Sequence, residues 1–262
     1  MECFKVFSGT RVVKISSSAK KQYDSLFFDL DDTLWNTARN SRESFLETFV
    51  EFDFARYFPS FDEFYSIYTV ENERLWDDYA HGLIEKDLLN FRRFAYPLEQ
   101  VGFSLKEVAE LVPIYSKFFF QLIPTKTSII PDAIEVLTEL KERGYRLFIL
   151  SNGFRELQEQ KLTYSGLAPF FEKVVLSEDI AVQKPDIRLY HFALSATQSN
   201  PSSVAMIGDN FYTDILGAHD AGWDQYYFNP PTSPWSGKHL REDLPFYPTA
   251  EVASLKELLT IF

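Results

Sequence analysis

The chain has 262 residues, of which 45% are hydrophobic and 24% charged, a composition that excludes a disordered or fibrous protein. Its formal net charge of -12 argues against binding to a nucleic acid polymer or an anionic membrane, so an anionic ligand must meet local positive charge or a metal. The single cysteine, Cys3, cannot form an internal disulfide, and we expect a reducing, cytoplasmic location.

Residues 1–22 differ in composition from the rest of the chain. There is no acidic residue between Phe4 and Tyr23, whereas five positions in this stretch are basic. A targeting peptide could have this composition, but the segment lacks a long apolar stretch and a helical period. We expect a loosely ordered basic leader over 1–22 that carries no chemistry. No apolar run in the sequence approaches the roughly 18 residues of a membrane span.

Short apolar runs after the leader predict strands that are buried on both faces. The runs are 25–30, 146–150, 174–176, 204–207 and 225–228. Helical patterns alternate with them at 131–144, 154–163, 186–197 and 212–221. Pro131 suits a first helical position, and Gly144 can end the same helix in a left-handed conformation. The alternation predicts an α/β domain with a doubly wound parallel sheet covered on both faces.

Between Trp35 and about Ser128 the alternation stops, and the pattern predicts several amphipathic helices without a buried strand. We therefore expect a helical domain at 37–127, inserted into an α/β core made of 23–36 and 128–262. The insertion is rich in aromatic residues. Most of them are expected in the core of a small helical bundle, and one or two could line a substrate pocket between the domains.

Polar residues follow four of the predicted strands. They are Asp29 and Asp31, then Ser151-Asn152-Gly153, then Lys184-Pro185, and finally Gly208-Asp209 with Asp214. In open α/β sheets the ligand sits beyond the carboxyl ends of the strands, so these groups are expected in one crevice. Four carboxylates there would repel one another unless a cation binds. Oxygen ligands of this kind suit Mg²⁺, which bridges to substrate phosphate.

Asp29 and Asp31 can flank one reacting phosphorus, because side chains two apart on a strand point to the same face. One carboxylate attacks and the other handles protons. Attack by a carboxylate divides hydrolysis of a phosphate ester into two easier steps, while Mg²⁺ and Lys184 offset the charge on the phosphoryl oxygens.

These four motifs, in this order, resemble those of the haloacid dehalogenase superfamily over most of the chain after Tyr23. The resemblance implies that Asp29 is the nucleophile and a metal ligand. It implies that Asp31 is the general acid and base and lends its backbone carbonyl to the metal, and that Asp209 completes the metal site. Thr33, in the first motif, would have a supporting role.

The same resemblance implies that Ser151 and the backbone of Asn152 hold the transferring phosphoryl group and that Lys184 neutralises its charge. Asp214 would support the metal water and orient Lys184. The insertion resembles the helical cap that this superfamily places between its first and second motifs. The enzyme is then expected to hydrolyse a small phosphorylated metabolite.

Three stretches resemble the bacterial pyrimidine 5'-nucleotidase subgroup. They are Leu75-Trp76 to Tyr79 with Gly82, Ser151-Asn152-Gly153-Phe154, and Ser177-Glu178-Asp179 to Lys184-Pro185. We therefore expect a nucleoside 5'-monophosphate as substrate, with Trp76 and Tyr79 as candidate cap residues that contact it, although both could be bundle core. The alternatives are a 2-haloacid dehalogenase, against which Asp31 argues, a sugar-phosphate mutase, and a non-catalytic phosphate-binding module. The oligomeric state stays open.

Overall fold

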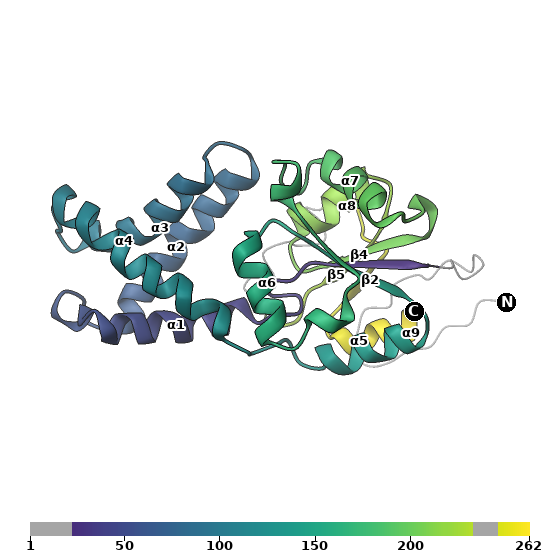
Figure 1. Ribbon diagram of the computed structural model, residues 1–262, viewed down its shortest axis with the longest axis horizontal. Coiled ribbons are helices and arrows are strands. Elements are labelled where there is room, and N and C mark those ends of the chain that lie inside the picture. Colours follow the sequence, from purple (N-terminus) through teal and green to yellow (C-terminus); the bar gives the residue numbers. More distant parts are fainter. Residues whose placement is uncertain (1–22, 233–245) are drawn as a thin grey trace.

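The computed structural model describes residues 23–232 and 246–262 and contains a six-stranded parallel sheet (Figure 1). The predicted leader over 1–22 lies outside the described residues. The strands are Ser25–Phe28 (β1), Arg146–Ser151 (β2), Lys173–Leu176 (β3), Val204–Gly208 (β4), Asp224–Phe228 (β5) and Ala250–Val252 (β6). Their spatial order is β3-β2-β1-β4-β5-β6, so the winding changes direction at β1. Sheets of this kind bind ligands beyond the carboxyl ends of the strands at such a switch point.

Apolar side chains alternate between the two faces of the sheet, and helices cover both. Phe27 of β1 faces a cluster formed with α7 (Ile187–Thr197) and α8 (Gly217–Asp220). Leu26 and Phe28 face the opposite cluster, which includes residues of α5 (Ala133–Glu142), α6 (Arg155–Tyr164) and α9 (Leu258–Ile261). Figure 1 shows α5 and α9 on one side of the sheet and α7 and α8 on the other. The predicted doubly wound α/β architecture is confirmed.

Two of the predicted helices differ from the expectation at their ends. The helix expected from Pro131 begins at Ala133, because Asp132 adopts a left-handed conformation at φ 66°. Gly144 takes the expected left-handed conformation at φ 89°. The stretch expected as one helix over 212–221 is a wide π-helical segment, Phe211–Leu216, followed by the short α8. The side chain of Asn210 accepts hydrogen bonds from two amides at the start of this segment.

Strand β6 was not predicted, because its three residues Ala250–Val252 are too few to show a period. It pairs in parallel with β5. Short 3₁₀ turns complete the connections in the described parts of the chain. They span Phe54–Arg56, Ile123–Thr125, Ala168–Phe170, Ser177–Asp179, Pro201–Ser203 and Leu255–Glu257.

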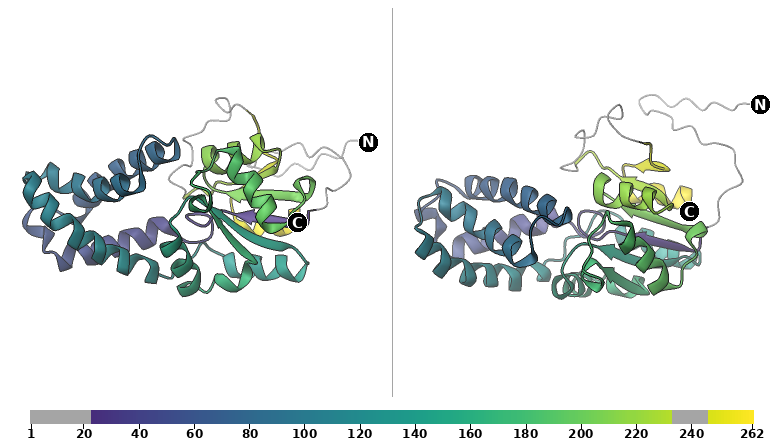
Figure 2. Two further views of the ribbon diagram at one scale, coloured as in Figure 1. Left: turned by 45° about the horizontal axis from the view of Figure 1, so that its top comes forward. Right: turned by 90° about the horizontal axis from the view of Figure 1, so that it is seen from above.

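Four long helices lie between β1 and β2 in the sequence, inside the segment proposed as the cap. They are α1 (Thr37–Glu51), α2 (Phe61–Ala80), α3 (Lys86–Gln100) and α4 (Leu105–Leu122). Aromatic side chains form much of their common core, where the ring of Phe45 stacks on Phe119 with centroids 4.1 Å apart. Both views in Figure 2 show these helices as a separate lobe beside the sheet. Within the described residues, no helix is both long enough and apolar enough to cross a membrane.

Candidate active site

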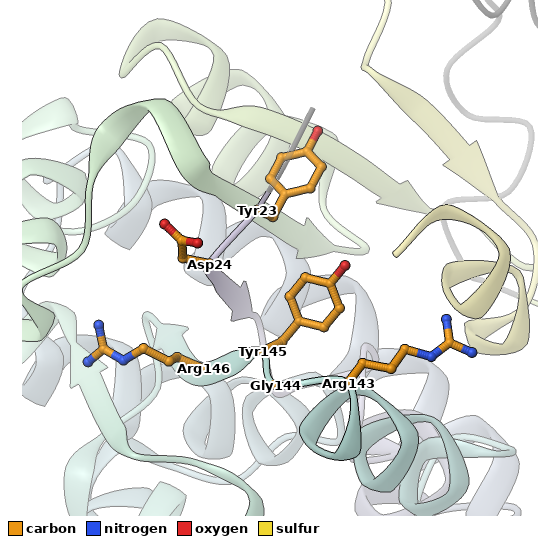
Figure 3. A pocket seen from close by; sticks show the side chains of 6 residues that line it. All are labelled: Tyr23, Asp24, Arg143, Gly144, Tyr145 and Arg146. Atoms are coloured by element: carbon orange, nitrogen blue, oxygen red, sulfur yellow. The ribbon is translucent and has the colours of Figure 1, made fainter. Parts of the chain in front are cut away.

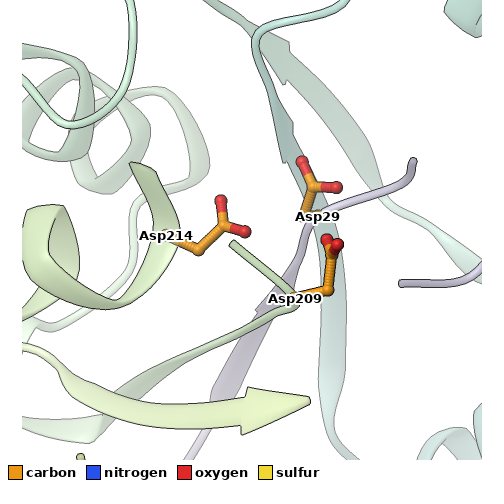
Figure 4. A group of neighbouring side chains, drawn as sticks. All are labelled: Asp29, Asp209 and Asp214. Atoms are coloured by element: carbon orange, nitrogen blue, oxygen red, sulfur yellow. The ribbon is translucent and has the colours of Figure 1, made fainter. Parts of the chain in front are cut away.

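Three buried carboxylates come together at the carboxyl ends of β1 and β4. Asp29 follows β1, Asp209 follows β4, and Asp214 lies one turn further along in the π-helical segment. Each offers an oxygen atom, and these oxygens all lie within 4.8 Å of one another (Figure 4). The strand-end positions of Asp29 and Asp209 bring them together, because β1 and β4 are neighbours in parallel register.

Lys184 provides the positive charge that faces this cluster. Its Nζ donates to Asp29 Oδ1 and to Asp214 Oδ1, both at 2.6 Å, and to the carbonyl oxygen of Leu150 at 2.9 Å. Burial lowers the pKa of Lys184, but the two carboxylates outweigh this effect and the net pKa lies above its usual value. The lysine therefore stays charged at the centre of the site.

One ammonium group does not balance three buried carboxylates. Burial raises the pKa of Asp209 well above its usual value, and the charges of Asp29 and Asp214 act in the same direction. Burial also raises the pKa of Asp29, an effect that Lys184 opposes. The donor set consists only of carboxylate oxygens with excess negative charge, which is the chemistry that a hard divalent cation such as Mg²⁺ prefers. The residues present therefore fit a magnesium ion.

Glycine is required at position 208 because the side chain of Asp214 approaches the backbone there. A Cβ at Gly208 would lie 2.3 Å from Asp214 Oδ2. The same oxygen accepts from the amide of Asn210 at 3.1 Å. On the other side of the cluster, Thr33 Oγ1 donates to Asp209 Oδ1 at 3.1 Å, so this threonine orients Asp209. The tight turn that brings Thr33 there has Asp32 at φ 57°.

The carboxylate of Asp31 contacts a different set of residues. Lys161 Nζ donates to its Oδ1 at 2.6 Å, Thr37 Oγ1 donates to the same oxygen at 2.7 Å, and Gln158 Nε2 donates to Oδ2 at 2.7 Å. Burial raises the pKa of Asp31, but Lys161 and the hydrogen bonds outweigh it, and the net pKa lies below its usual value. Asp31 is thus held as an anion.

Gln158 and Lys161 were not found from the sequence. Both lie on α6 and are buried, at 0% and 7% exposure, although glutamine and lysine are usually exposed. Their spacing of three residues places them on one face of the helix that follows the Ser151 motif. That spacing was the available signal, but many surface helices carry similar pairs.

The Ser151 motif connects Asp31 to the Lys184 loop. Ser151 Oγ accepts from the amide of Gly153 at 3.1 Å and from Gln158 Nε2 at 2.8 Å. A Cβ at Gly153 would lie 2.0 Å from Gln158 Nε2, so glycine leaves the space that this amide occupies. The side chain of Asn152 accepts from the Lys184 amide at 2.7 Å and donates to the Lys184 carbonyl at 3.0 Å. The structure thus places every residue predicted for the core site in one connected group.

Trp76 and Tyr79, the candidate substrate residues in the cap, pack against Phe154 of the core. The rings of Trp76 and Phe154 stack with centroids 5.5 Å apart, and Tyr79 meets Phe154 edge-on at 6.0 Å. Lys86 Nζ lies 4.3 Å from the centre of the Phe154 ring and donates to Glu178 at 2.8 Å. These residues therefore form a contact between the cap helices and the loop after β2.

A cavity of about 360 Å³ lies elsewhere in the molecule (Figure 3). Its walls are formed by residues at the amino ends of β1 and β2, namely Tyr23, Asp24, Arg143, Gly144, Tyr145 and Arg146. It is thus at the opposite edge of the sheet from the carboxylates, and both arginines are already bonded to glutamates, Glu139 and Glu172. We assign the chemistry to the carboxylate cluster.

Comparison with known proteins shows which family the sequence and fold of this chain resemble. A family model described as haloacid dehalogenase-like hydrolase matches residues 23–222. The pyrimidine 5'-nucleotidase YjjG of Escherichia coli is 30% identical over 240 residues, which cover 90% of this chain and 96% of YjjG. A glyceraldehyde 3-phosphate phosphatase of Methanothermobacter thermautotrophicus is 28% identical, over 90% of this chain and 99% of that protein. The magnesium-bound structure of YfnB from Bacillus subtilis is 26% identical, with a TM-score of 0.78, over 92% of this chain and 99% of YfnB.

Proposed function

Because this chain belongs to the haloacid dehalogenase-like hydrolase family and is a phosphatase of that family, we propose that it hydrolyses nucleoside 5'-monophosphates through a phospho-aspartate on Asp29. The observation that supports this most is the position of Asp29. Its carboxylate lies 2.6 Å from Lys184 Nζ and beside Asp209 and Asp214, at the edge of the sheet where folds of this kind bind ligands.

In the first step, an oxygen of Asp29 attacks the phosphorus and the bond to the leaving oxygen breaks. Asp31, once protonated, donates its proton to the leaving alkoxide. Lys184 offsets negative charge on the phosphoryl oxygens, and Ser151 and the backbone of Asn152 donate hydrogen bonds to them. In the second step, a water molecule attacks the phosphorus, Asp31 takes its proton, and the bond to Asp29 breaks to release phosphate.

Asp29, Asp209 and the backbone carbonyl of Asp31 would hold Mg²⁺, with Asp214 in support. When bound, the ion acts as a Lewis acid that withdraws charge from the phosphoryl oxygens. Thr33 keeps Asp209 oriented toward this position through its hydrogen bond. The remaining chemistry belongs to the residues of the chain.

Two observations support a nucleotide as the substrate. YjjG, which is similar over nearly its whole length, is a pyrimidine 5'-nucleotidase. The cap residue Trp76 presents an aromatic ring at the contact with the Ser151 motif, and a base that stacks on such a ring gains on the order of 1–3 kcal/mol. A simple sugar phosphate gains nothing comparable from the ring.

The test is a comparison of kcat/KM for UMP and dTMP with that for AMP, phosphoglycolate, glyceraldehyde 3-phosphate and a hexose phosphate. We expect the pyrimidine nucleotides to be preferred. Faster turnover of a sugar phosphate would overturn the nucleotidase assignment and leave the phosphatase assignment in place. Interconversion of sugar phosphates without phosphate release would identify a mutase instead. Release of chloride from a 2-chloroacid would identify a dehalogenase.

The mechanism is tested by two substitutions. Asp29→Asn should abolish turnover, because an amide is a poor nucleophile, and near-normal activity would refute the phospho-aspartate. Asp31→Asn should slow the reaction by about 10²- to 10⁴-fold, the usual contribution of general acid-base catalysis. A non-catalytic phosphate-binding module would show no metal-dependent phosphate release in the wild type.

A further inference from the structure

Arg93 on α3 is a buried arginine that lacks a carboxylate partner among the described residues. Its side chain is almost fully enclosed, with 6% of the residue exposed. One terminal nitrogen donates to Asn90 Oδ1 at 2.6 Å, and the hydroxyl of Tyr68 also bonds to the guanidinium. Its Nε is buried and has no acceptor within the described parts of the chain.

This arrangement differs from that of the other arginines in the cap. All five of them form ion pairs with acidic residues, and they are Arg39, Arg42, Arg56, Arg74 and Arg92. Arginine stays charged in proteins, and burying a charge without a carboxylate is costly. A buried N–H without an acceptor adds to that cost. Such a group is explained if a ligand supplies the missing acceptor.

The surroundings of Arg93 are flat and aromatic. The central guanidinium carbon lies 5.8 Å from the centre of the Trp76 ring, and the rings of Phe94 and Phe120 lie at 5.4 and 5.1 Å. The polar groups nearby belong to amide and phenol side chains. Tyr68, which contacts the guanidinium, also donates to Asn72 Oδ1 at 3.1 Å. The site thus combines one cation with planar apolar walls.

Trp76 connects this site to the active-site loop. The same indole ring that lies beside Arg93 stacks on Phe154, which comes two residues after Asn152. One aromatic ring therefore separates the guanidinium from the core at the contact between the two lobes. None of the carboxylates of the candidate active site is among the groups that act on Arg93, so the guanidinium does not belong to the carboxylate cluster.

We propose that Arg93 is a specificity-determining residue whose Nε donates a hydrogen bond to a carbonyl oxygen of the substrate's base. A nucleobase supplies both features that the site lacks, a planar acceptor for Nε and a flat face for the aromatic walls. Uracil, thymine and cytosine carry a carbonyl group, whereas adenine has none. This inference rests on the proposed function. It adds that Arg93 selects the leaving group, which is the nucleoside of the substrate.

The experiment compares the wild-type full-length protein with Arg93→Met in the presence of Mg²⁺. The measured quantities are kcat/KM for UMP, dTMP, AMP, phosphoserine and p-nitrophenyl phosphate, together with the thermal unfolding midpoint. We expect the ratio of kcat/KM for UMP to that for p-nitrophenyl phosphate to fall about 10- to 150-fold, the range for loss of one hydrogen bond that involves a charged group. The same ratio for AMP should change less than threefold.

Arg92→Met is the matched control, because Arg92 is the neighbouring arginine and is paired with Glu99 at 2.7 Å. It should leave all substrate ratios unchanged. Arg93→Lys, which keeps the charge but lacks Nε, should show the same loss of selectivity as Arg93→Met. It also serves as the second test if the methionine variant does not fold.

Four outcomes would overturn the inference. An equal fall for every substrate, with a lower unfolding midpoint, would show that Arg93 acts only in the stability of the cap. A fall confined to phosphoserine would identify a carboxylate as its ligand. Unchanged ratios, with normal hydrolysis of UMP, would refute the role of Arg93 alone, whereas a wild type that hydrolyses no nucleotide would refute the proposed function as well.

Discussion

Lys161 Nζ donates to Asp31 Oδ1 at 2.6 Å, although the two residues lie 130 positions apart in the sequence. The ammonium group also lies 4.6 Å from the centre of the Trp35 ring. Lys161 therefore connects the helix that follows the Ser151 motif to the proposed general acid and base. This ion pair stabilises the ionised form of Asp31, whereas acid catalysis requires the protonated form.

The first prediction concerns the pH dependence of the rate in Lys161→Met. Lys161 lowers the pKa of Asp31, so its removal should raise that pKa, and the protonated form should persist to higher pH. The limb of the kcat/KM profile that reports loss of the Asp31 proton should then move to higher pH. Lys141→Met is the control, because Lys141 is exposed and donates to the carbonyl of Pro169. An unshifted profile in Lys161→Met would contradict this role.

The second prediction concerns Asp209 and the metal. In the wild type, chelation should abolish phosphate release, and added Mg²⁺ should raise the unfolding midpoint, because a ligand that binds only the folded state stabilises it. Asp209→Asn should remove most of that rise. Undiminished hydrolysis after exhaustive chelation would show that no metal is needed.

The metal-free protein gives a second readout for Asp209. The folded-state pKa of Asp209 is raised, chiefly by burial, so above about pH 4 the unfolded state releases this proton more easily than the folded state. The free energy of unfolding should therefore fall as pH rises from about 4 toward neutral. Asp209→Asn should reduce this fall and raise the midpoint of the metal-free protein near pH 7. A lower midpoint in that variant would contradict the repulsion argument.

The third prediction uses Gly153 and Gln158 as a pair. Gly153→Ala should displace the Gln158 amide, which lies 2.0 Å from the added Cβ, and so disturb its hydrogen bonds to Asp31 and Ser151. We expect kcat to fall about 10-fold or more, since small displacements of catalytic groups have effects of this size. In the double variant Gly153→Ala, Gln158→Ala, the rate should equal that of Gln158→Ala alone. Fully additive losses would mean that Gly153 acts independently of Gln158.

The fourth prediction tests the contact between Trp76 and Phe154. Trp76→Ala should lower kcat/KM for UMP by about 5- to 150-fold, the equivalent of losing 1–3 kcal/mol of base stacking. The effect on glyceraldehyde 3-phosphate should be smaller, because this substrate has no ring. Phe118→Ala serves as a control within the cap, since Phe118 contacts Phe52 and not Phe154. Equal losses for both substrates would show that Trp76 holds the lobes together without recognising the base.

The sequence alone was sufficient to predict five strands of the parallel sheet and to group the residues proposed for the site at one of its edges. Strands such as β1 are buried on both faces, so a short apolar run is a local signal that needs no knowledge of distant contacts. The carboxyl ends of parallel strands share one edge, and for this reason Asp29, Ser151 and Asp209 could be assigned to one crevice. The resemblance to a known family then gave each of these residues its expected role. The comparisons confirm that the chain belongs to that family.

Only the tertiary structure decided which side chains meet. The partners of Asp31 depend on the rotation of α6, which turns Gln158 and Lys161 inward, and no local pattern distinguishes this face from an exposed one. The burial of Arg93 without a carboxylate depends on how α2, α3 and α4 pack in the cap. Strand β6 forms because β5 offers it an edge to pair with. These features arise from contacts between residues far apart in the chain, and packing of complete elements is what selects them.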